Sequence, residues 1–358
     1  MKKKLVGMFA TATLLTMALA GNVQAAEIRS VGPDGEAAVD ASTIELTDDQ
    51  IAQIKEGGYT AAICLHYGGN DWSTSQQKGL EDTFGELGIE IVAVTDANFS
   101  AETQVSNIET VMAKKPDILV SIPTDATATA DAYKQAAAAG IKIVFMDQRA
   151  DGLEAGKDYV SVVSADNYGN GYASGTVLGD ALGGKGKVAM VYYDANFAPT
   201  NQRDEGFRDA MKNYPDIEIV TEQGFTDESG CAEQGDAILT QFPNIDGIYA
   251  SWDVPMEGVL SAVRAAGMEG KVTLACNDLG NNVAREIASG NIAGGGAQMP
   301  YDQGVAEAKL AALALLGEET PSYVAVPAET VTHENVLEAY TDVYHVETPD
   351  WLKEAYVE

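Results

Sequence analysis

The feature that most constrains the fold is a regular alternation of short, mostly apolar runs and segments with helical periodicity. The runs are four to seven residues long and follow one another at residues 60–65, 89–94, 117–122, 141–146, 159–163, 187–193, 217–220, 247–251, 271–275 and 292–297. Strands that are apolar along their whole length are typically buried on both faces, as in parallel sheets covered by helices. The alternation therefore predicts an α/β fold.

The number of strand-and-helix units is too high for one small sheet. The arrangement that fits best is two Rossmann-like domains, each a doubly wound parallel sheet with helices on both faces. A closed barrel of eight parallel strands and eight helices is also compatible with the pattern alone.

The first 26 residues have the composition of a secretory signal peptide. Three lysines precede an apolar run that ends in small residues, which predicts cleavage near Ala25 or Ala26. The apolar run is too short for a membrane anchor. The sequence therefore predicts a soluble exported protein, in which residues 27–58 form an N-terminal extension with one short helix.

Charge and motif content argue against several classes of function. The formal net charge is −32, with no basic cluster to offset it, so nucleic acid is not expected as a partner. The three cysteines and three histidines form no CxxC motif and no helical histidine pair. No dinucleotide fingerprint follows the first strand, and neither a phosphate loop nor a catalytic triad can be assembled. No catalytic residue, metal site or cofactor is therefore expected.

Local signals indicate how the helix after the first strand begins. Ser73 and Gln76 have the spacing of a capping box, and Gly88 is placed to end the helix. Asp71, just before them, is expected to contribute to the same cap.

Polar and aromatic side chains stand directly after the predicted strands or at the start of the next helix. Ligands of open parallel α/β sheets bind beyond the carboxyl ends of the strands. The candidate binding residues at these places are His66, Asn70, Trp72, Asp147, Gln148, Arg203, Trp252, Asp278 and Gln298. Carboxylates accept hydrogen bonds from hydroxyl groups, arginine donates them and amides do both, while indole faces cover apolar C–H groups. This combination predicts a neutral ligand rich in hydroxyl groups.

Several segments, read in order, resemble the type I periplasmic sugar-binding proteins of the ribose-binding family, the soluble receptors of ABC importers. They are LHYGGNDWSTSQQKGLEDTFGELG, IPTDATATADAYKQAAAAGIKIVFMDQ, SADNYGNGYASG, TNQRDEGFRDAM and GAQMPYDQGVAEA. The resemblance spans about residues 59–345. It implies two Rossmann-like lobes joined by a three-stranded hinge that close on a ligand. The lobes it implies are residues 59–164 plus 298–325 and residues 165–297 plus 326–345, followed by a tail over residues 346–358.

The resemblance also implies partners, a location and one further site residue. Phe225 matches a position at which the family stacks an aromatic ring on its ligand. The expected partners are a small polyhydroxy ligand and the permease subunits of an ABC transporter, with a chemoreceptor as an optional third. The expected location is the periplasm.

The chain departs from the family pattern at three positions. Gln148 stands where the family often has arginine, Ser73 where an aromatic residue is common, and Trp252 where asparagine is common. These changes favour a ligand other than ribose: another pentose, a hexose, a deoxyhexose or a polyol. The alternative is a binding protein for a non-sugar signal, such as an autoinducer, that feeds a chemoreceptor or sensor.

Overall fold

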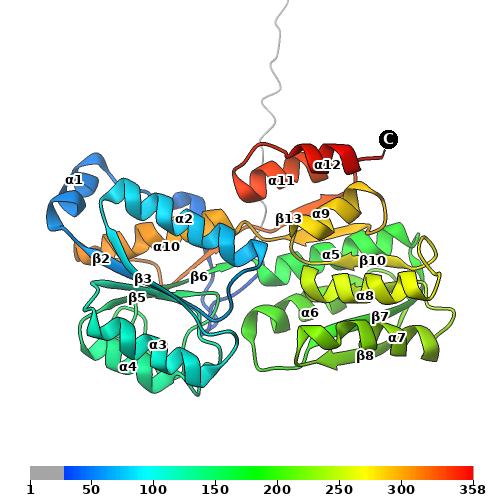
Figure 1. Cartoon of the computed structure of the whole chain (residues 1–358), viewed down its shortest axis with the longest axis horizontal. Coiled ribbons are helices and arrows are strands. Elements are labelled where there is room, and N and C mark those ends of the chain that lie inside the picture. Colours follow the sequence, from blue (N-terminus) through cyan, green and yellow to red (C-terminus); the bar gives the residue numbers. More distant parts are fainter. Residues whose placement is uncertain (1–27, 358) are drawn as a thin grey trace, which may run out of the picture.

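Two separate sheets, each covered by helices, form the two halves of the protein (Figure 1). The structure is a computed structural model that describes residues 28–357, so the predicted signal peptide lies outside the described residues. Because both sheets are open, with free edge strands, the barrel that the pattern alone left possible is wrong. The fold is α/β, with two doubly wound domains, as the alternation predicts.

The first sheet, with its helices, forms lobe 1. All its neighbouring strands are parallel, in the order β1 (Val39–Asp40), β12 (Tyr323–Val326), β6 (Ser161–Ala165), β5 (Lys142–Met146), β4 (Ile118–Ser121), β2 (Thr60–Leu65) and β3 (Glu90–Asp96). Its helices are α1 (Asp48–Gly57), α2 (Asp71–Leu87), α3 (Ala101–Ala113), α4 (Ala130–Ala138) and α10 (Pro300–Leu315).

The second sheet, with its helices, forms lobe 2. Its strand order is β13 (Glu329–Thr332), β11 (Gly294–Ala297), β10 (Thr273–Cys276), β9 (Gly247–Ala250), β7 (Lys185–Tyr193) and β8 (Asp216–Phe225). Its helices are α5 (Asn167–Ala181), α6 (Ala198–Met211), α7 (Cys231–Gln241), α8 (Asp253–Ala265), α9 (Asn281–Ala288), α11 (Val336–Tyr344) and α12 (Asp350–Ala355). The edge strand β13 runs antiparallel to β11, which the sequence pattern did not predict.

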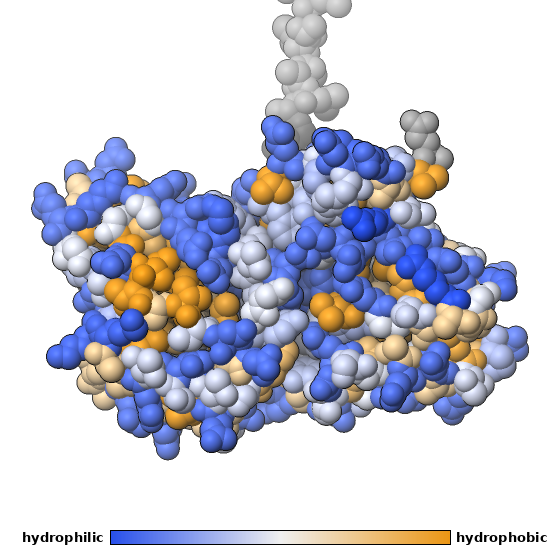
Figure 2. Space-filling model, viewed as in Figure 1, coloured by the Kyte–Doolittle hydropathy of each residue, from blue (hydrophilic) through white to orange (hydrophobic). Residues whose placement is uncertain are grey.

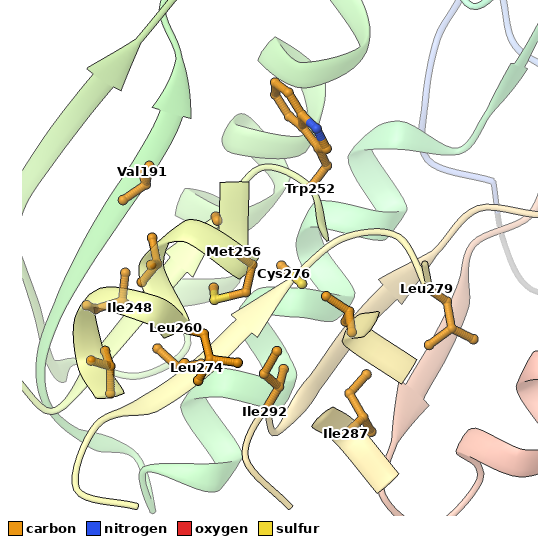
Figure 3. Close-up of a cluster of buried hydrophobic side chains, with 14 of the residues drawn as sticks. Val191, Ile248, Trp252, Met256, Leu260, Leu274, Cys276, Leu279, Ile287 and Ile292 are labelled. Carbon is orange, nitrogen blue, oxygen red and sulfur yellow. The ribbon is translucent and has the colours of Figure 1, made fainter. Parts of the chain in front are cut away.

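Strand β2 illustrates why both faces of a sheet must be covered. Its side chains alternate between faces. Ile63 and Leu65 pack into the cluster that includes Leu80 of α2, whereas Cys64 packs into the cluster that includes Tyr133 of α4. In lobe 2 the larger cluster lies between the sheet and helices α7, α8, α9 and α11, and Trp252 marks one end of it (Figure 3).

The chain passes between the lobes three times. It leaves lobe 1 between β6 and α5, returns between β11 and α10, and leaves again between β12 and β13. These passages lie near the positions that the resemblance implied, but the exact domain boundaries stay a prediction. Among residues 28–357, no helix is long and apolar enough to cross a membrane.

The N-terminal extension is more ordered than the sequence suggested. The predicted helix is α1, capped by Thr47, and the segment before it contributes β1 to the first sheet. The backbone N–H groups of Arg29 and Ser30 donate to the Asp166 carboxylate at 2.9 and 2.8 Å, at the point where the chain leaves β6. The extension is therefore attached at a passage between the lobes.

The surface is mostly hydrophilic, in keeping with the large negative charge (Figure 2). The face shown carries one hydrophobic patch on lobe 1, around the edge strand β3, where Val94 is 43% exposed.

Candidate functional site

A pocket between the two lobes collects side chains from the carboxyl ends of both sheets. The space between its walls, including the part open to solvent, is about 520 Å³. Eight of the ten residues that the sequence singled out line it: His66, Asn70, Trp72, Asp147, Arg203, Trp252, Asp278 and Gln298. Trp72 comes from lobe 1 and Trp252 from lobe 2, so the two indoles face one pocket from opposite sides.

Two of the pocket carboxylates stand on left-handed backbone. Asp147, directly after β5, has φ of 54°, and Asp278, which follows β10, has φ of 69°. Non-glycine residues rarely adopt this conformation, and aspartate tolerates it better than most. Each backbone N–H still bonds to a strand of the same sheet, Asp147 to Val163 at 2.7 Å and Asp278 to Gly296 at 2.8 Å. The turn thus directs both carboxylates out of the sheets, and such backbone strain is common at functional sites.

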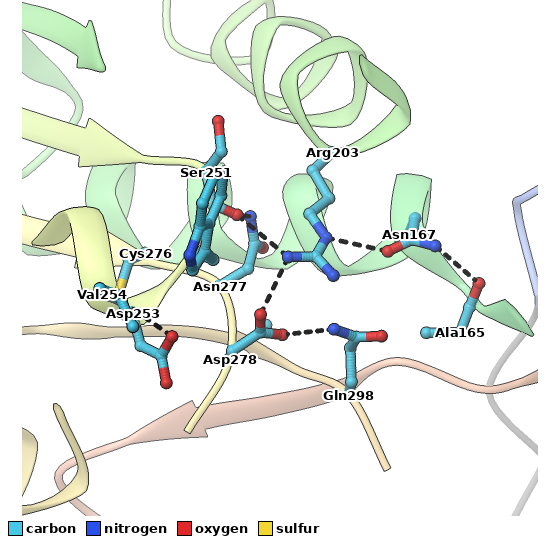
Figure 4. A network of polar contacts seen from close by, with 12 residues as sticks. Ala165, Asn167, Arg203, Ser251, Asp253, Val254, Cys276, Asn277, Asp278 and Gln298 are labelled. Carbon is cyan, nitrogen blue, oxygen red and sulfur yellow. Dashed lines mark hydrogen bonds and ion pairs between the residues drawn. The ribbon is translucent and has the colours of Figure 1, made fainter. Parts of the chain in front are cut away.

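Arg203 is the hub of a buried polar network on the lobe 2 side (Figure 4). Its Nη1 donates to Asp278 Oδ2 at 2.9 Å and to the Ser251 carbonyl at 3.2 Å, and its Nε donates to Asn167 Oδ1 at 2.9 Å. Gln298 Nε2 donates to the other oxygen of Asp278 at 2.8 Å. The network holds one guanidinium and one carboxylate together at the pocket wall, with their charges paired.

Asp147 is held through only one of its two oxygens. Oδ1 accepts from Ser164 Oγ at 2.8 Å, and the Ala165 N–H and Gln303 Nε2 each approach it at 3.4 Å. Oδ2 has no hydrogen-bond partner within residues 28–357. Burial raises the pKa of this carboxyl. Asp147 therefore keeps one oxygen available on the pocket side.

Three polar atoms of the pocket lining are buried and have no hydrogen-bond partner among the described residues. They are His66 Nδ1, Trp72 Nε1 and Gln298 Oε1. Burial lowers the pKa of His66 to about 3, so the imidazole is neutral at physiological pH. Buried polar groups without partners are rare because each one costs free energy. Together these three atoms offer a hydrogen-bond donor, an acceptor and an imidazole nitrogen that can serve as either.

Aromatic rings form much of the remaining wall. The Tyr67 and Phe99 rings stack with centroids 4.6 Å apart, and the His66 and Phe197 rings stack at 5.5 Å across the two lobes. Trp252 meets the ring of Tyr193 edge-on at 5.5 Å. Such a wall suits a ligand that presents apolar C–H faces between its polar groups.

Glu228 lies at the same pocket, between aromatic donors of both lobes. Its Oε1 accepts from Trp252 Nε1 at 2.9 Å, and its Oε2 is 3.4 Å from Tyr67 Oη. Burial raises the pKa of the Glu228 carboxyl. The hydrogen bond from its ring nitrogen thereby fixes the orientation of the Trp252 indole at the pocket wall.

Asn70 has a structural role in addition to its place in the pocket. It is the N-cap of α2, and its Oδ1 accepts from the Ser73 N–H at 2.8 Å. The expected capping box with Ser73 as the N-cap is wrong, because the helix begins earlier, at Asp71. Within residues 28–357 the amide nitrogen of Asn70 donates no hydrogen bond, so it is available to a ligand.

The structure places two of the predicted residues outside the pocket lining. Gln148 turns away, so that its Nε2 donates to the Pro123 carbonyl at 2.8 Å and its Oε1 accepts from the Ala198 N–H at 3.1 Å. Phe225 packs behind Trp252, with ring centroids 5.1 Å apart, and is 4% exposed. Direct ligand contact is therefore not expected of either: Gln148 braces the two lobes and Phe225 supports Trp252.

Sequence reasoning missed the other half of the lining: Tyr67, Phe99, Ile122, Tyr193, Phe197, Pro199, Thr200 and Glu228. Tyr67 and Tyr193 stand at strand ends and could have been found there. Phe99 and Glu228 lie in loop or short 3-10 segments with no periodic signal. Within residues 28–357, no cluster of three or more acidic, histidine or cysteine side chains could hold a metal ion.

Comparison with known proteins gives a consistent family. The profile of the periplasmic binding protein domain matches residues 61–319. The D-ribose/D-allose-binding protein of Pseudomonas aeruginosa is 29% identical over 73% of this chain and 83% of that protein. The ribose import binding protein of Salmonella typhimurium is 24% identical over 76% of this chain and 90% of that protein.

Solved structures share the fold. A periplasmic solute-binding protein of an ABC transporter from Actinobacillus succinogenes, with bound D-allose, has a TM-score of 0.72 and 29% identity, covering 78% of this chain and 99% of that one. One from Agrobacterium vitis, bound with α-D-tagatopyranose, has a TM-score of 0.74 and 25% identity, covering 82% of this chain and 100% of that one.

The family match spans well over half of the chain, and the alignments cover most of the length of these relatives. The solved structures share the two-lobed fold. The chain therefore belongs to the periplasmic binding protein family, as a type I sugar-binding member similar to the ribose-binding proteins.

Proposed function

We propose that the protein is an exported receptor that binds one monosaccharide or related polyol between its lobes and delivers it to the permease of an ABC transporter. The observation that carries the proposal is that three residues lining one pocket each have a buried polar atom without a hydrogen-bond partner among residues 28–357: His66 Nδ1, Trp72 Nε1 and Gln298 Oε1. A ligand that both donates and accepts hydrogen bonds over a short span would satisfy all three.

Charge supports a neutral ligand. The guanidinium of Arg203 is paired with Asp278, and His66 is neutral because burial lowers its pKa. The free oxygen of Asp147 can accept from a hydroxyl group, a bond that is stronger to a charged partner. An anionic ligand would meet Asp147, Asp278 and Glu228 against one arginine, and would be repelled.

The roles we assign follow the pocket geometry. Asp147, Arg203 and Gln298 would bond ligand hydroxyls, and Asn70, Asp278 and His66 would complete the polar set. Trp72 and Trp252 would cover opposite ring faces. These assignments are part of the proposal, with Gln148 and Phe225 moved to supporting roles.

The ligands named for the relatives set the range to test: ribose, allose and tagatopyranose. Residue 148 is glutamine, where the family often has arginine, and its side chain faces Pro123 and Ala198, so position 148 supplies no cationic donor beside Asp147. This difference favours a polyhydroxy compound other than ribose, within the pentoses, hexoses, deoxyhexoses and polyols.

The test is a thermal-shift screen of the purified mature protein against these compounds, followed by calorimetry on each hit. A ligand that binds only the folded state raises the melting temperature, and about 100-fold excess over Kd adds about 2.7 kcal/mol. His66→Ala and Gln298→Ala should lose the shift, whereas the matched surface change Asn282→Ala should keep it. Failure of every compound to bind, or binding that survives both pocket variants, would overturn the proposal.

The screen also distinguishes sugar binding from the alternative function, binding of a non-sugar signal. A non-sugar signal would leave all sugars and polyols inactive while a culture extract still raised the melting temperature. Delivery to the transporter is tested separately: cells that lack the gene for this protein should lose uptake of the identified compound.

A further inference from the structure

A carboxylate of lobe 1 caps a helix of lobe 2. Asp71, the first residue of α2, accepts two hydrogen bonds from Asn281, the first residue of α9: the backbone N–H reaches Oδ2 at 2.7 Å and the side-chain Nδ2 reaches Oδ1 at 2.8 Å. The N-terminal end of α2 points toward lobe 2 (Figure 1). Asp71 does not line the pocket, and its carboxylate bonds to Asn281 rather than facing the proposed ligand.

Helix α9 has no capping side chain of its own. Its N-cap is Gly280, and no acidic residue stands in its first turn. The first N–H groups of a helix need acceptors, and a carboxylate there also interacts favourably with the helix dipole. Asp253 accepts from the Gly280 N–H at 2.9 Å, and Asp71 supplies the next acceptor from the other lobe.

Neighbouring residues leave room for this contact and orient its two partners. A Cβ at Gly280 would lie 2.1 Å from Asp253 Oδ2 and 3.2 Å from Asp71 Oδ2, so glycine leaves room for both carboxylates. Tyr340 Oη donates to Asn281 Oδ1 at 2.5 Å, which turns the amide nitrogen of Asn281 toward Asp71.

We infer that Asp71 is a positioning residue, a latch that holds the two lobes together in the closed state. It does not contact the ligand, but by slowing the opening of the lobes it sets how long a ligand stays bound. The ligand part of this inference rests on the proposed function. Opening the lobes breaks both bonds and returns the α9 terminus to water. Some other polar contacts between the lobes, such as Tyr67 with Glu228, include pocket residues and would alter the site itself. The contacts of Gln148 with Ala198 and of Asp302 with His345 also join the lobes outside the pocket lining, so Asp71 shares the latch with them.

The first test measures lobe closure in the full mature protein by single-molecule energy transfer. Dyes at Glu102→Cys and Glu233→Cys report on lobes 1 and 2, and the native cysteines are buried. We expect Asp71→Ala to have a smaller closed fraction than wild type, without sugar and at each concentration of D-allose. Equal distributions at every concentration, zero included, would overturn the latch. If D-allose fails to close wild type, that result counts against the proposed ligand range, while the sugar-free comparison still decides the latch.

The second test separates a latch from a general loss of structure. For any compound that binds in the screen, Asp71→Ala should raise the dissociation rate about tenfold and leave the association rate within about twofold. Asn281→Pro should do the same from the other lobe, because proline suits the first helical position and Gly280 has extended backbone with ψ of 157°.

Controls make the outcome specific. Combining Asp71→Ala with Asn281→Pro should add little to either single change, since both remove the same contact. Asn282→Ala, one residue further along α9 and bonded within lobe 2 to Glu257, should behave as wild type. Additive effects of the pair, or a slower association with an unchanged dissociation rate, would overturn the inference.

Discussion

Arg203 Nη1 lies 2.9 Å from Asp278 Oδ2, and less than a tenth of either side chain is exposed. The pair joins Arg203, in the second turn of α6, to Asp278, which follows the end of β10. Gln298 completes it from the passage between β11 and α10. One buried ion pair therefore links the proposed binding surface to a place where the chain passes between the lobes.

Arg203→Ala should abolish ligand binding and also destabilise the fold. The change leaves Asp278 buried without its cation, and breaking a buried pair costs about 3–5 kcal/mol. Chemical denaturation should register this loss of unfolding free energy. Arg208→Ala, which breaks the half-exposed pair with Glu222, should cost no more than about 1 kcal/mol. Similar losses for both variants would contradict the buried role of Arg203.

Tryptophan fluorescence should respond to ligand through two of the three indoles. Trp72 and Trp252 line the pocket, whereas Trp351 packs against Tyr340 with ring centroids 5.6 Å apart. Trp72→Phe and Trp252→Phe should each remove part of the ligand-induced change, and Trp351→Phe should preserve it. A signal lost only with Trp351→Phe would place the binding site elsewhere.

His66 should make the protein less stable in acid. Its folded pKa is about 3, below its ordinary value of 6.5, so the unfolded chain binds more protons between these values. Its stabilising effect is thus fully present above pH 6.5 and declines as the pH falls toward 3, by up to about 1.4 kcal/mol per pH unit. In denaturation at pH 4, 5, 6 and 7, His66→Gln should flatten this slope; parallel slopes would show that His66 ionises freely in the folded state.

Phe225 should act through Trp252 and not through the ligand. Phe225→Ala should cost about 3–5 kcal/mol of stability through the cavity it leaves and weaken ligand binding by freeing the indole. Phe225→Leu should cost less than about 1.5 kcal/mol and retain most of the affinity. Calorimetry on both variants decides: a full loss of binding with Leu would return Phe225 to the ligand-contacting set.

Ligand binding should close the lobes as rigid bodies. Contacts from both sheets to one ligand favour the closed arrangement over the open one. Small-angle scattering should give a smaller radius of gyration with a confirmed ligand than without it. An unchanged radius would indicate lobes that are already closed in the free protein.

Part of this architecture could be read from local sequence. The fully apolar runs and the helical spacing between them identify an α/β fold because strand burial and helix amphipathicity are written into short segments. The rule that ligands bind beyond strand ends then located His66, Asp147 and Asp278, since the chain direction of each strand determines which end its exit residue occupies.

Only the tertiary structure decided which side chains meet. Gln148 and Asp147 are neighbours in sequence, yet Asp147 faces the pocket and Gln148 faces Pro123 and Ala198. Phe225 was predicted to contact the ligand, yet the residue of that stretch that lines the pocket is Glu228, three positions further along the chain. Such outcomes depend on the packing of segments far apart in the chain, which no local pattern records. The contact of Asp71 with Asn281, 210 residues away, exists only because the two lobes face each other in the folded protein.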